Sequence, residues 1–536
     1  MEEFIEMPLA QPSHSATSIV GTPRDMIADA SKLQRTGHLA EAERICRQIL
    51  EIDPGHADSM HLLGVIAYQT GRLGDACELI GKALAIDDQN AGYHSNLGMV
   101  LMAQGKLDHA ATCYERALAI WPDFVAARLN LGSVFHAQGK FDEAQACCER
   151  VLALDPTLAQ AHSSLGAVLQ AQGKLNEALL CSERAVALNP DLAEAHHNLG
   201  RLLRTLGRPD EALASFRCAI ALQPNYAQAH FSESMMLLLR GDFASGWPGY
   251  ERRWQSVDQN TPQRAYSQPL WRGEATDRVL IWGEQGVGDE IMFAGLIPDV
   301  LRTGTRCILD CDARLKPLFA RSFPQVDVVT GHSPDQPGEL KFSAHLPSAS
   351  LPGLFRTSTA AFASTTSPYL FADSNERERF RAAYADGRRL VGLAWQTNSP
   401  QSGQIRSIDL SLLAPLFAHD GIQWISLQYG SHDALEAQAS AAAAPIFVDR
   451  SVDQLSDMDQ FAAQVAAMDL VITIDNSTAH LAAALGIPVW LLLPFAPDWR
   501  WQEQREDSPW YPTMRLFRQP AFGDWQSVVQ RVLHSL

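Results

Sequence analysis

The chain has 536 residues, which is too long for a single hydrophobic core, so we expect two or three domains. Hydrophobic residues make up 46% of the sequence, enough to fill packed cores, and the formal net charge is −18. General binders of nucleic acid or of anionic membranes carry a basic excess, so this charge argues against both classes. No signal-peptide pattern opens the chain, and no stretch approaches the ~20 apolar residues that span a bilayer. Among the nine cysteines, Cys113, Cys147 and Cys181 lie one repeat length apart, which indicates core filling rather than a disulfide framework and fits a reducing cytoplasm. There is no CxxC pair, so no structural zinc site is expected.

Residues 1–22 form a polar segment with prolines, and we expect a disordered tail there. From residue 23 to about 260 the sequence repeats with a period of 34 residues. In each repeat, the glycine of a Leu-Gly pair and a later alanine let two helices approach closely. A second glycine makes the turn between these helices, and a proline starts the next helical hairpin. The repeated positions are Leu63-Gly64, Leu97-Gly98, Leu131-Gly132, Leu165-Gly166 and Leu199-Gly200; Gly71, Gly105, Gly139, Gly173 and Gly207; Ala76, Ala110, Ala144, Ala178 and Ala212; and Pro122, Pro156, Pro190 and Pro224. This pattern resembles the tetratricopeptide repeat, which predicts an α-solenoid, a superhelix with a concave face.

One column of this array carries Asn96, Asn130 and Asn198, with Ser164 between them. Stacked side-chain amides each offer a donor and an acceptor, so they suit an extended polypeptide backbone. The column resembles the asparagine ladder in the repeats of O-linked N-acetylglucosamine transferases, and it predicts a polypeptide acceptor on the concave face. The alternative, that asparagine merely suits a solvated inner face, stays open. A parallel column of His94, His162, His196 and His230 is expected to pack between helices rather than to bind metal.

The repeat ends in an aromatic cluster near residues 241–254, which we expect to fix the array to its neighbour. A linker over 261–278 follows, and the pattern then changes to short apolar runs that alternate with helices. Such alternation predicts parallel sheets covered on both faces, here as two Rossmann-like αβα lobes over 279–385 and 386–536. The predicted strands are 279–282, 307–309, 326–329, 390–395, 424–427, 446–448, 470–474 and 489–493. Ligands of such sheets bind at the carboxyl ends of the strands, so we expect a site between the lobes.

Two polar turns follow strands at the places where such a site would form. The first contains Gly286 and Gly288, which let a ligand approach the backbone, and Asp289, where a helix begins. The second is the segment 475–480, whose small polar residues can start a helix. The free N–H groups of a helix start attract anions, so this turn predicts a diphosphate and ribose site. Asp289 could instead be a simple helix cap.

Residues 279–536 resemble glycosyltransferases of the lipopolysaccharide heptosyltransferase type, in the form that bacteria fuse behind tetratricopeptide repeats. The resemblance is carried by Gly288-Asp289, Arg406-Ser407-Ile408 and the segment 475–480. It implies a GT-B module in which the C-terminal lobe holds the nucleotide-sugar donor and Asp289 is the general base of an inverting reaction. Arg406 lies near the position at which the family has a lysine that steadies the donor diphosphate. Alternatively, Arg406 could be an exposed loop residue. The residues expected at the donor are Gly286, Gly288, Trp395, Gln396, Arg406, Asp475, Asn476, Ser477, Thr478 and His480.

Other motifs are weighed against this interpretation. Asp310 and Asp312 match the DxD pattern of metal-dependent transferases, but the two-lobe pattern favours a metal-free reaction, so no metal or cofactor is expected. His345 lies in the first lobe, where a group on the acceptor side could be placed, but it is interpreted as an incidental loop residue. The aromatic loop at 495–512 could either wall the donor base or brace the lobes.

The sequence therefore predicts a cytoplasmic transferase that moves a sugar from a nucleotide donor to a polypeptide, such as flagellin or another surface protein. Two alternatives remain open. The transferase module could have lost its activity and serve as a scaffold, or the acceptor could be a glycan, with the repeats used for assembly.

Overall fold

The computed structural model describes residues 22–256, 263–334, 340–365, 367–398 and 403–536. The predicted tail, except Thr22, and the start of the predicted linker lie outside these ranges. The chain divides into two compact units, one of residues 1–203 with 218–225 and one of residues 204–217 with 226–536. The second unit thus contains the last helical hairpin as well as the whole region beyond it.

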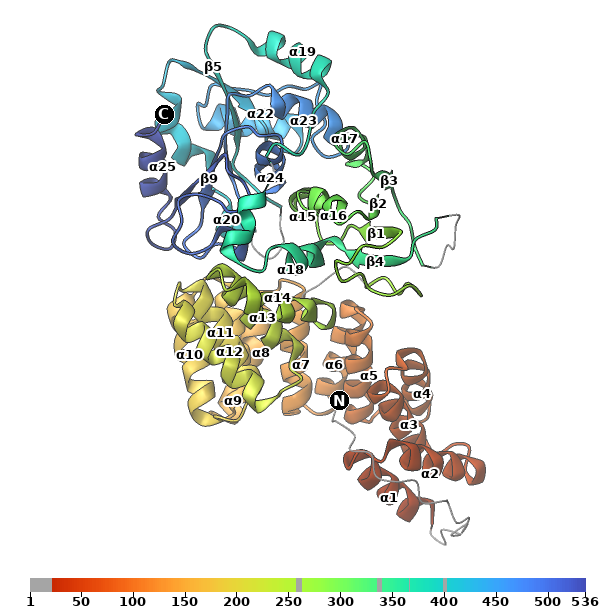
Figure 1. Ribbon diagram of the computed structural model, residues 1–536. Coiled ribbons are helices and arrows are strands. Elements are labelled where there is room, and N and C mark those ends of the chain that lie inside the picture. The colour runs from red at the N-terminus through yellow and green to blue at the C-terminus, as the bar shows by residue number, and fades with distance from the viewer. Residues whose placement is uncertain (1–21, 257–262, 335–339, 366, 399–402) are drawn as a thin grey trace. The chain divides into compact units, whose positions relative to one another are not determined.

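Helices follow one another from residue 23 to residue 250 (Figure 1). Their bounds are α1 Pro23–Arg35, α2 Leu39–Ile52, α3 Ala57–Gln69, α4 Leu73–Ile86, α5 Ala91–Ala103, α6 Leu107–Ile120, α7 Val125–Ala137, α8 Phe141–Leu154, α9 Ala159–Ala171, α10 Leu175–Leu188, α11 Ala193–Thr205, α12 Pro209–Leu222, α13 Ala227–Leu239 and α14 Phe243–Tyr250. A short 3-10 helix, η1 Glu251–Gln255, continues α14.

The two glycines of each repeat have the roles that their spacing predicts. A Cβ atom at Gly98 would lie 2.8 Å from the Tyr114 ring, so only glycine lets α5 and α6 approach this closely. Gly105, in the turn between the same helices, has a φ of 74°, a conformation that glycine adopts without strain. The solenoid of helical hairpins expected over this region is therefore present.

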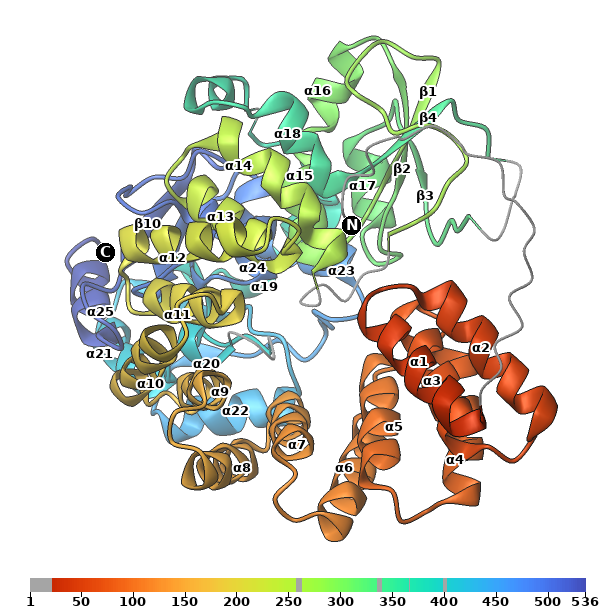
Figure 2. The same cartoon turned by 90° about the horizontal axis from the view of Figure 1, so that it is seen from below.

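The first sheet is parallel and has the strand order β3-β2-β1-β4. Its strands are β1 Arg278–Trp282, β2 Arg306–Asp310, β3 Asp327–Val329 and β4 Ala344–Pro347, and its helices are α15 Val287–Ala294, α16 Ile297–Arg302, α17 Lys316–Ser322 and α18 Leu351–Phe355, with η2 Ser348–Ser350 and η3 Thr359–Ser364. In the second unit, α14 packs beside α18 (Figure 2).

The second sheet is also parallel, with the order β10-β9-β8-β5-β6-β7. Its strands are β5 Arg389–Ala394, β6 Ile422–Ser426, β7 Ile446–Phe447, β8 Leu470–Ile474, β9 Val489–Leu493 and β10 Met514–Arg518. Its helices are α19 Ser374–Tyr384, α20 Gly403–Arg406, α21 Ala414–Phe417, α22 His432–Ala441, α23 Met458–Ala466, α24 Ser477–Ala484 and α25 Trp525–Leu533, with η4 Leu410–Leu413 and η5 Trp499–Trp501. Numbered within this sheet, the order is that of a doubly wound α/β sheet, and its direction of winding reverses between β5 and β8.

None of the described helices has the length and apolar character that a membrane crossing requires.

Candidate functional site

The two polar turns singled out in the sequence meet in the structure. Helix α15 begins after β1, α24 begins after β8, and the two helices pack against each other. A Cβ atom at Gly288 would lie 3.2 Å from Cδ2 of His480 and 3.4 Å from Cα of Ser477. Glycine at this position therefore lets two helix starts, one from each sheet, come into direct contact.

The start of α24 holds buried polar groups that have no partner. Asn476 is the N-cap: its Oδ1 atom accepts the backbone N–H of Ala479 and the hydroxyl of Thr473, each at 3.1 Å. The Asn476 amide nitrogen and the Thr478 hydroxyl are buried and lack a hydrogen-bond partner among the described residues. Unpaired buried donors are costly, so this turn is suited to bind a polar ligand.

Five charged side chains alternate in sign from one turn to the other. Asp289 pairs with Arg500, which also pairs with Asp498 at 2.6 Å. Arg406 lies 3.7 Å from the same Asp498 carboxylate and 3.1 Å from Asp475. Burial would raise the pKa of Asp498, but Arg500 and Arg406 hold it below its ordinary value. The series of ion pairs thus connects Asp289, in the turn after β1, to Asp475, in the turn after β8.

Asp289 also has a structural role in its own helix. One of its carboxylate oxygens accepts the backbone N–H of Gly286 at 3.2 Å, which is one half of a capping box, since the N-cap Gly286 has no side chain to return the bond. The other pairs with Arg500. The cap alternative considered from the sequence is therefore a real interaction, and it coexists with the position of Asp289 beside the second turn.

His480 lies in the same place, but as a buried, neutral ring. Its Nδ1 atom is 2.9 Å from the Tyr511 hydroxyl, and the ring stacks on Trp501 at 5.3 Å. Burial lowers the pKa of His480 to about 4, so it carries no charge at neutral pH. It is suited to hydrogen bonding and packing rather than to neutralising a phosphate.

Arg500 was not singled out from the sequence, although it is the cation that contacts Asp289. Its guanidinium lies over the Trp499 ring at 4.7 Å, and both residues belong to the aromatic loop. A single arginine between two tryptophans in a loop rich in proline and aspartate is the signal that could have suggested a held cation.

Trp395 is a correction to the predicted donor site. Its side chain is fully buried in the core of the second sheet, and its indole N–H donates to Gln438 at 3.0 Å. It therefore presents no side chain to a donor. The next residue, Gln396, is half-buried, and the Gln428 side chain accepts its backbone N–H at 2.8 Å. Gln396 thus remains a candidate at the carboxyl end of β5.

The predicted acceptor residues belong to the helical array, on α5, α7 and α11, and all are half-buried. The Asn96 amide nitrogen is 2.7 Å from Nε2 of His61, and that of Asn198 donates to Ser163 at 3.0 Å. Asn130 occupies the matching position on α7. The histidine column interacts with nearby backbone instead: Nε2 of His94, for example, lies 3.0 Å from the carbonyl oxygen of Asp88.

The remaining polar motifs of the first sheet are engaged internally. Asp310 pairs with Arg264, and Asp312 with Arg314 at 2.7 Å. Across the described parts of the chain, no group of three or more His, Cys, Asp or Glu side chains could hold a metal ion. The expectation that His345 lies in a loop is wrong: it is buried in β4, within 3.3 Å of the Trp282 indole nitrogen.

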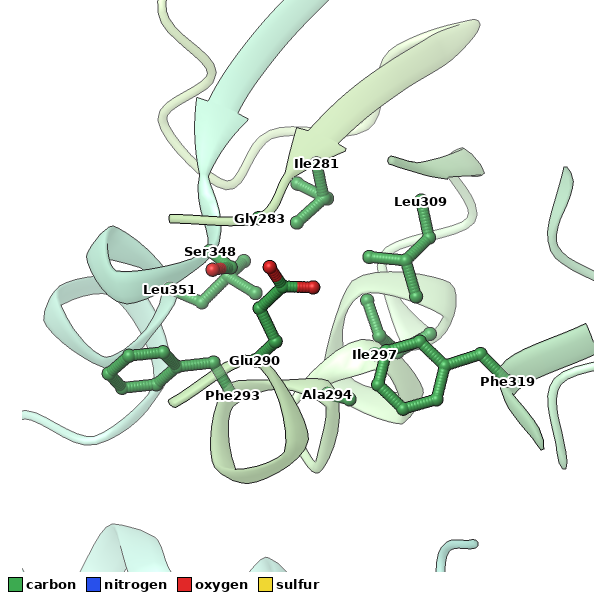
Figure 3. A pocket seen from close by; sticks show the side chains of 10 residues that line it. All are labelled: Ile281, Gly283, Glu290, Phe293, Ala294, Ile297, Leu309, Phe319, Ser348 and Leu351. Carbon is green, nitrogen blue, oxygen red and sulfur yellow. The ribbon is translucent and has the colours of Figure 1, made fainter. Parts of the chain in front are cut away.

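A small pocket lies behind the first turn, and Glu290 points into it (Figure 3). The Glu290 carboxylate accepts the backbone N–H of Asp312 at 2.9 Å, and burial raises its pKa to about 7. The space holds about one water molecule, so it cannot admit a nucleotide.

The aromatic loop packs against the end of the helical array. Trp499 contacts Trp247 and Tyr250 of α14 at centroid distances of 5.4 and 5.8 Å. Trp510 contacts Trp499 at 6.0 Å and Phe362 at 4.8 Å. Of the two sequence alternatives for this loop, these contacts favour bracing.

Comparison with known proteins identifies the repeats. Tetratricopeptide-repeat family profiles match residues 33–98, 95–159, 157–225 and 197–265. The chain is therefore a tetratricopeptide-repeat protein in its N-terminal part, followed by a region with two parallel sheets. Protein FlbA of Caulobacter vibrioides is 28% identical over 327 residues, which are 57% of this chain and 54% of FlbA. The chain thus spans about half the length of this curated relative.

Solved structures resemble the helical part. They include Pseudomonas aeruginosa PilF, with a TM-score of 0.34, 22% identity and coverage of 39% of this chain and 94% of that chain. A tetratricopeptide repeat protein from Parabacteroides merdae has a TM-score of 0.39 and 15% identity over 43% of this chain and 91% of its own. YrrB, described as a TPR protein with an unusual peptide-binding site, has a TM-score of 0.28 and 22% identity over 34% and 95%.

Proposed function

We propose that this protein is an inverting, metal-independent glycosyltransferase that moves a sugar from a nucleotide-sugar donor to a polypeptide. The observation that carries the proposal is the meeting of two strand-end turns, with Asp289 on one and the start of α24 on the other. Two parallel sheets that direct their carboxyl ends to one place are the arrangement expected of a GT-B enzyme.

The donor would bind at the second sheet. Its winding reverses between β5 and β8, and ligands of doubly wound sheets bind at that point. Arg406 follows β5 on α20, and Asp475 follows β8. A guanidinium can bind a diphosphate through two parallel hydrogen bonds, so Arg406 would exchange a carboxylate partner for the donor. The unpaired amide of Asn476, which is 7% exposed, would donate to a further oxygen of the nucleotide sugar, whereas the Thr478 hydroxyl is fully buried.

The chemistry would be a single displacement. Asp289 takes the proton of the acceptor hydroxyl while the oxygen attacks the anomeric carbon from the face opposite the leaving group. A new carbon–oxygen bond forms, and the bond to the diphosphate breaks with its electron pair on the leaving nucleoside diphosphate. Arg406 and the N–H groups at the start of α24 would stabilise that negative charge, which is the role a metal ion has in other transferases.

The acceptor would be an extended polypeptide segment, such as a part of flagellin or another surface protein, on the array. Asn96, Asn130 and Asn198 are the residues proposed to bind its backbone. The tetratricopeptide repeats support this class of acceptor, because stacked helical repeats form the extended concave surfaces that repeat proteins use for binding.

The first test is a thermal-shift screen against nucleoside diphosphates and nucleotide sugars, with and without a chelator. A ligand that binds only the native state raises the melting temperature. A chelator-insensitive shift would identify the donor family for a transfer assay. A shift that requires metal would contradict the metal-free reaction, and the absence of any shift would favour a scaffold.

The second test separates catalysis by Asp289 from its capping role. Asp25 is the control, because its carboxylate makes the corresponding bond in α1, accepting the Thr22 backbone N–H at 3.2 Å, and in addition it accepts the Thr22 hydroxyl at 2.7 Å. Both Asp289→Asn and Asp25→Asn remove a capping carboxylate. We expect only Asp289→Asn to lower kcat, by ~100-fold or more, a typical contribution of a general base. Equal turnover in both variants would refute the role of Asp289 as base.

A further inference from the structure

The last helical segment of the array, α14 with η1, contacts the first turn from several directions. The turn comprises residues 283–290 and leads from β1 into α15. Both the segment and the turn lie in the second compact unit. The contacts are of different kinds, and each involves either Asp289 or a residue of the turn that precedes it.

The strongest contact is a buried ion pair. Nε and Nη2 of Arg253 donate to the two carboxylate oxygens of Glu284 at 3.0 and 2.8 Å. The two side chains are 0% and 1% exposed, so water does not weaken their attraction. Nη2 of Arg253 also donates to the Ser350 hydroxyl at 2.8 Å. A bidentate pair fixes orientation as well as distance, so η1 sets the position of Glu284.

The second contact holds a residue in an unfavourable conformation. Gln285 has a φ of 66°, a region that residues other than glycine seldom occupy. Its side-chain amide donates to the Tyr250 hydroxyl at 2.9 Å. Backbone conformations of this kind persist only where surrounding contacts hold them, and Tyr250 supplies one such contact.

The third contact reaches Asp289 through the aromatic loop. Trp247 and Tyr250 pack edge-on against Trp499, and the Arg500 guanidinium lies on the Trp499 ring. Arg500 then pairs with Asp289. Trp499 is 3% exposed, so its ring cannot move without displacing α14.

We propose that α14 and η1 are a positioning element of the transfer site, that Tyr250 and Arg253 are its positioning residues, and that Arg500 of η5 is a third positioning residue, held by this element through Trp499. This inference rests on the proposed function. The three residues act through Gln285, Glu284 and Asp289 and not on the substrate itself. The last hairpin of the repeat array is thus a structural part of the site, and a displacement of about 1 Å at Asp289 would lower turnover by ~100-fold.

The test compares two tyrosine-to-phenylalanine variants of the full chain. Tyr250→Phe removes a hydroxyl that accepts an amide hydrogen from Gln285 at 2.9 Å. Tyr384→Phe, on α19, is the control: it removes a hydroxyl that accepts from Gln464 at the same 2.9 Å and that also donates to Asp449 at 2.6 Å. Hydrogen–deuterium exchange of the amides of residues 283–290 and the kcat and KM of transfer are measured for both.

We expect Tyr250→Phe to speed hydrogen–deuterium exchange in residues 283–290 and to lower kcat by ~10-fold. The KM for the donor and the rise in melting temperature caused by the nucleoside diphosphate should stay unchanged. Tyr384→Phe should leave all of these values as in the wild type. Wild-type exchange and wild-type kcat in Tyr250→Phe would overturn the inference. Hydrogen–deuterium exchange is measured without a donor. If the wild-type protein transfers no sugar, the proposed function is refuted, and the exchange of residues 283–290 still decides whether Tyr250 holds the turn.

Arg500 provides a second test through a conservative change. Arg500→Gln removes the cation beside Asp289, while Arg500→Lys keeps the charge and loses the planar fork. We expect kcat to fall in the order wild type, Lys, Gln, at constant donor KM. Equal kcat in all three, or a loss confined to KM, would overturn the positioning role of Arg500.

Discussion

Replacing Glu284 with glutamine should destabilise the second compact unit by about 3 kcal/mol. The change is nearly isosteric, but it leaves the Arg253 guanidinium buried without its bidentate partner. Removing one member of a buried pair costs about 3–5 kcal/mol, because the remaining charge is left in a low-dielectric interior. Glu251 also pairs with Arg253 at 3.0 Å and is half exposed, so part of the charge stays compensated and the lower end is expected.

The assay is the melting temperature of the unit, followed by tryptophan fluorescence. For a unit of this size, 3 kcal/mol corresponds to a decrease of about 5 °C. Glu376→Gln is the matched control, since Glu376 pairs with Arg379 at 2.7 Å on the surface of α19. An exposed pair contributes about 0–1 kcal/mol, so this variant should melt within about 2 °C of the wild type. Equal melting temperatures in the two variants would refute the reasoning from burial.

The site and the array give three further predictions. Arg406→Gln should weaken the binding of the nucleoside diphosphate found in the thermal-shift screen by ~10-fold, as measured by calorimetry, since a charge-assisted hydrogen bond is lost; unchanged affinity would argue against its diphosphate role. His480 has a folded-state pKa of about 4, so the unfolded state binds its proton first as the pH falls below 6.5. The wild type should therefore lose about 2 kcal/mol of stability between pH 7 and pH 5, and His480→Gln should lose less over the same interval in urea denaturation. Gly207→Ala should lower the melting temperature more than Gly173→Ala: both glycines have positive φ, but only at Gly207 would the new Cβ meet the Phe495 ring. Equal decreases in melting temperature would show that the Phe495 ring moves away from the new Cβ atom without a cost in stability.

Much of the fold could be predicted because its signals are local. A strict 34-residue period places glycine at each tight turn, as at Gly105, and at each close helix contact, as at Gly98. The approach of Gly288 to His480 also followed from a general rule, since the carboxyl ends of parallel strands are where such turns gather.

The parts that could not be predicted depend on long-range packing. Trp395 ends a strand that is buried on both faces, so alternation could not separate a core side chain from one at the site. The short strand β4, with a histidine and a proline in four residues, carries too weak a pattern to be recognised. Arg253 and Arg500 gave no sign of their partners, which lie 31 and 211 residues away in sequence.

The place where the chain divides has a consequence for how such proteins diversify. Residues 204–217, which include most of α12, and the hairpin of α13 and α14 belong to the unit that contains both sheets, whereas residues 1–203 with 218–225 form a unit of their own. We therefore expect an exchange of repeats to succeed among α1 to α10 and to fail from residue 204 onward, before the apparent end of the array. Whole 34-residue repeats could be gained or lost there, while the unit that contains both sheets is inherited intact.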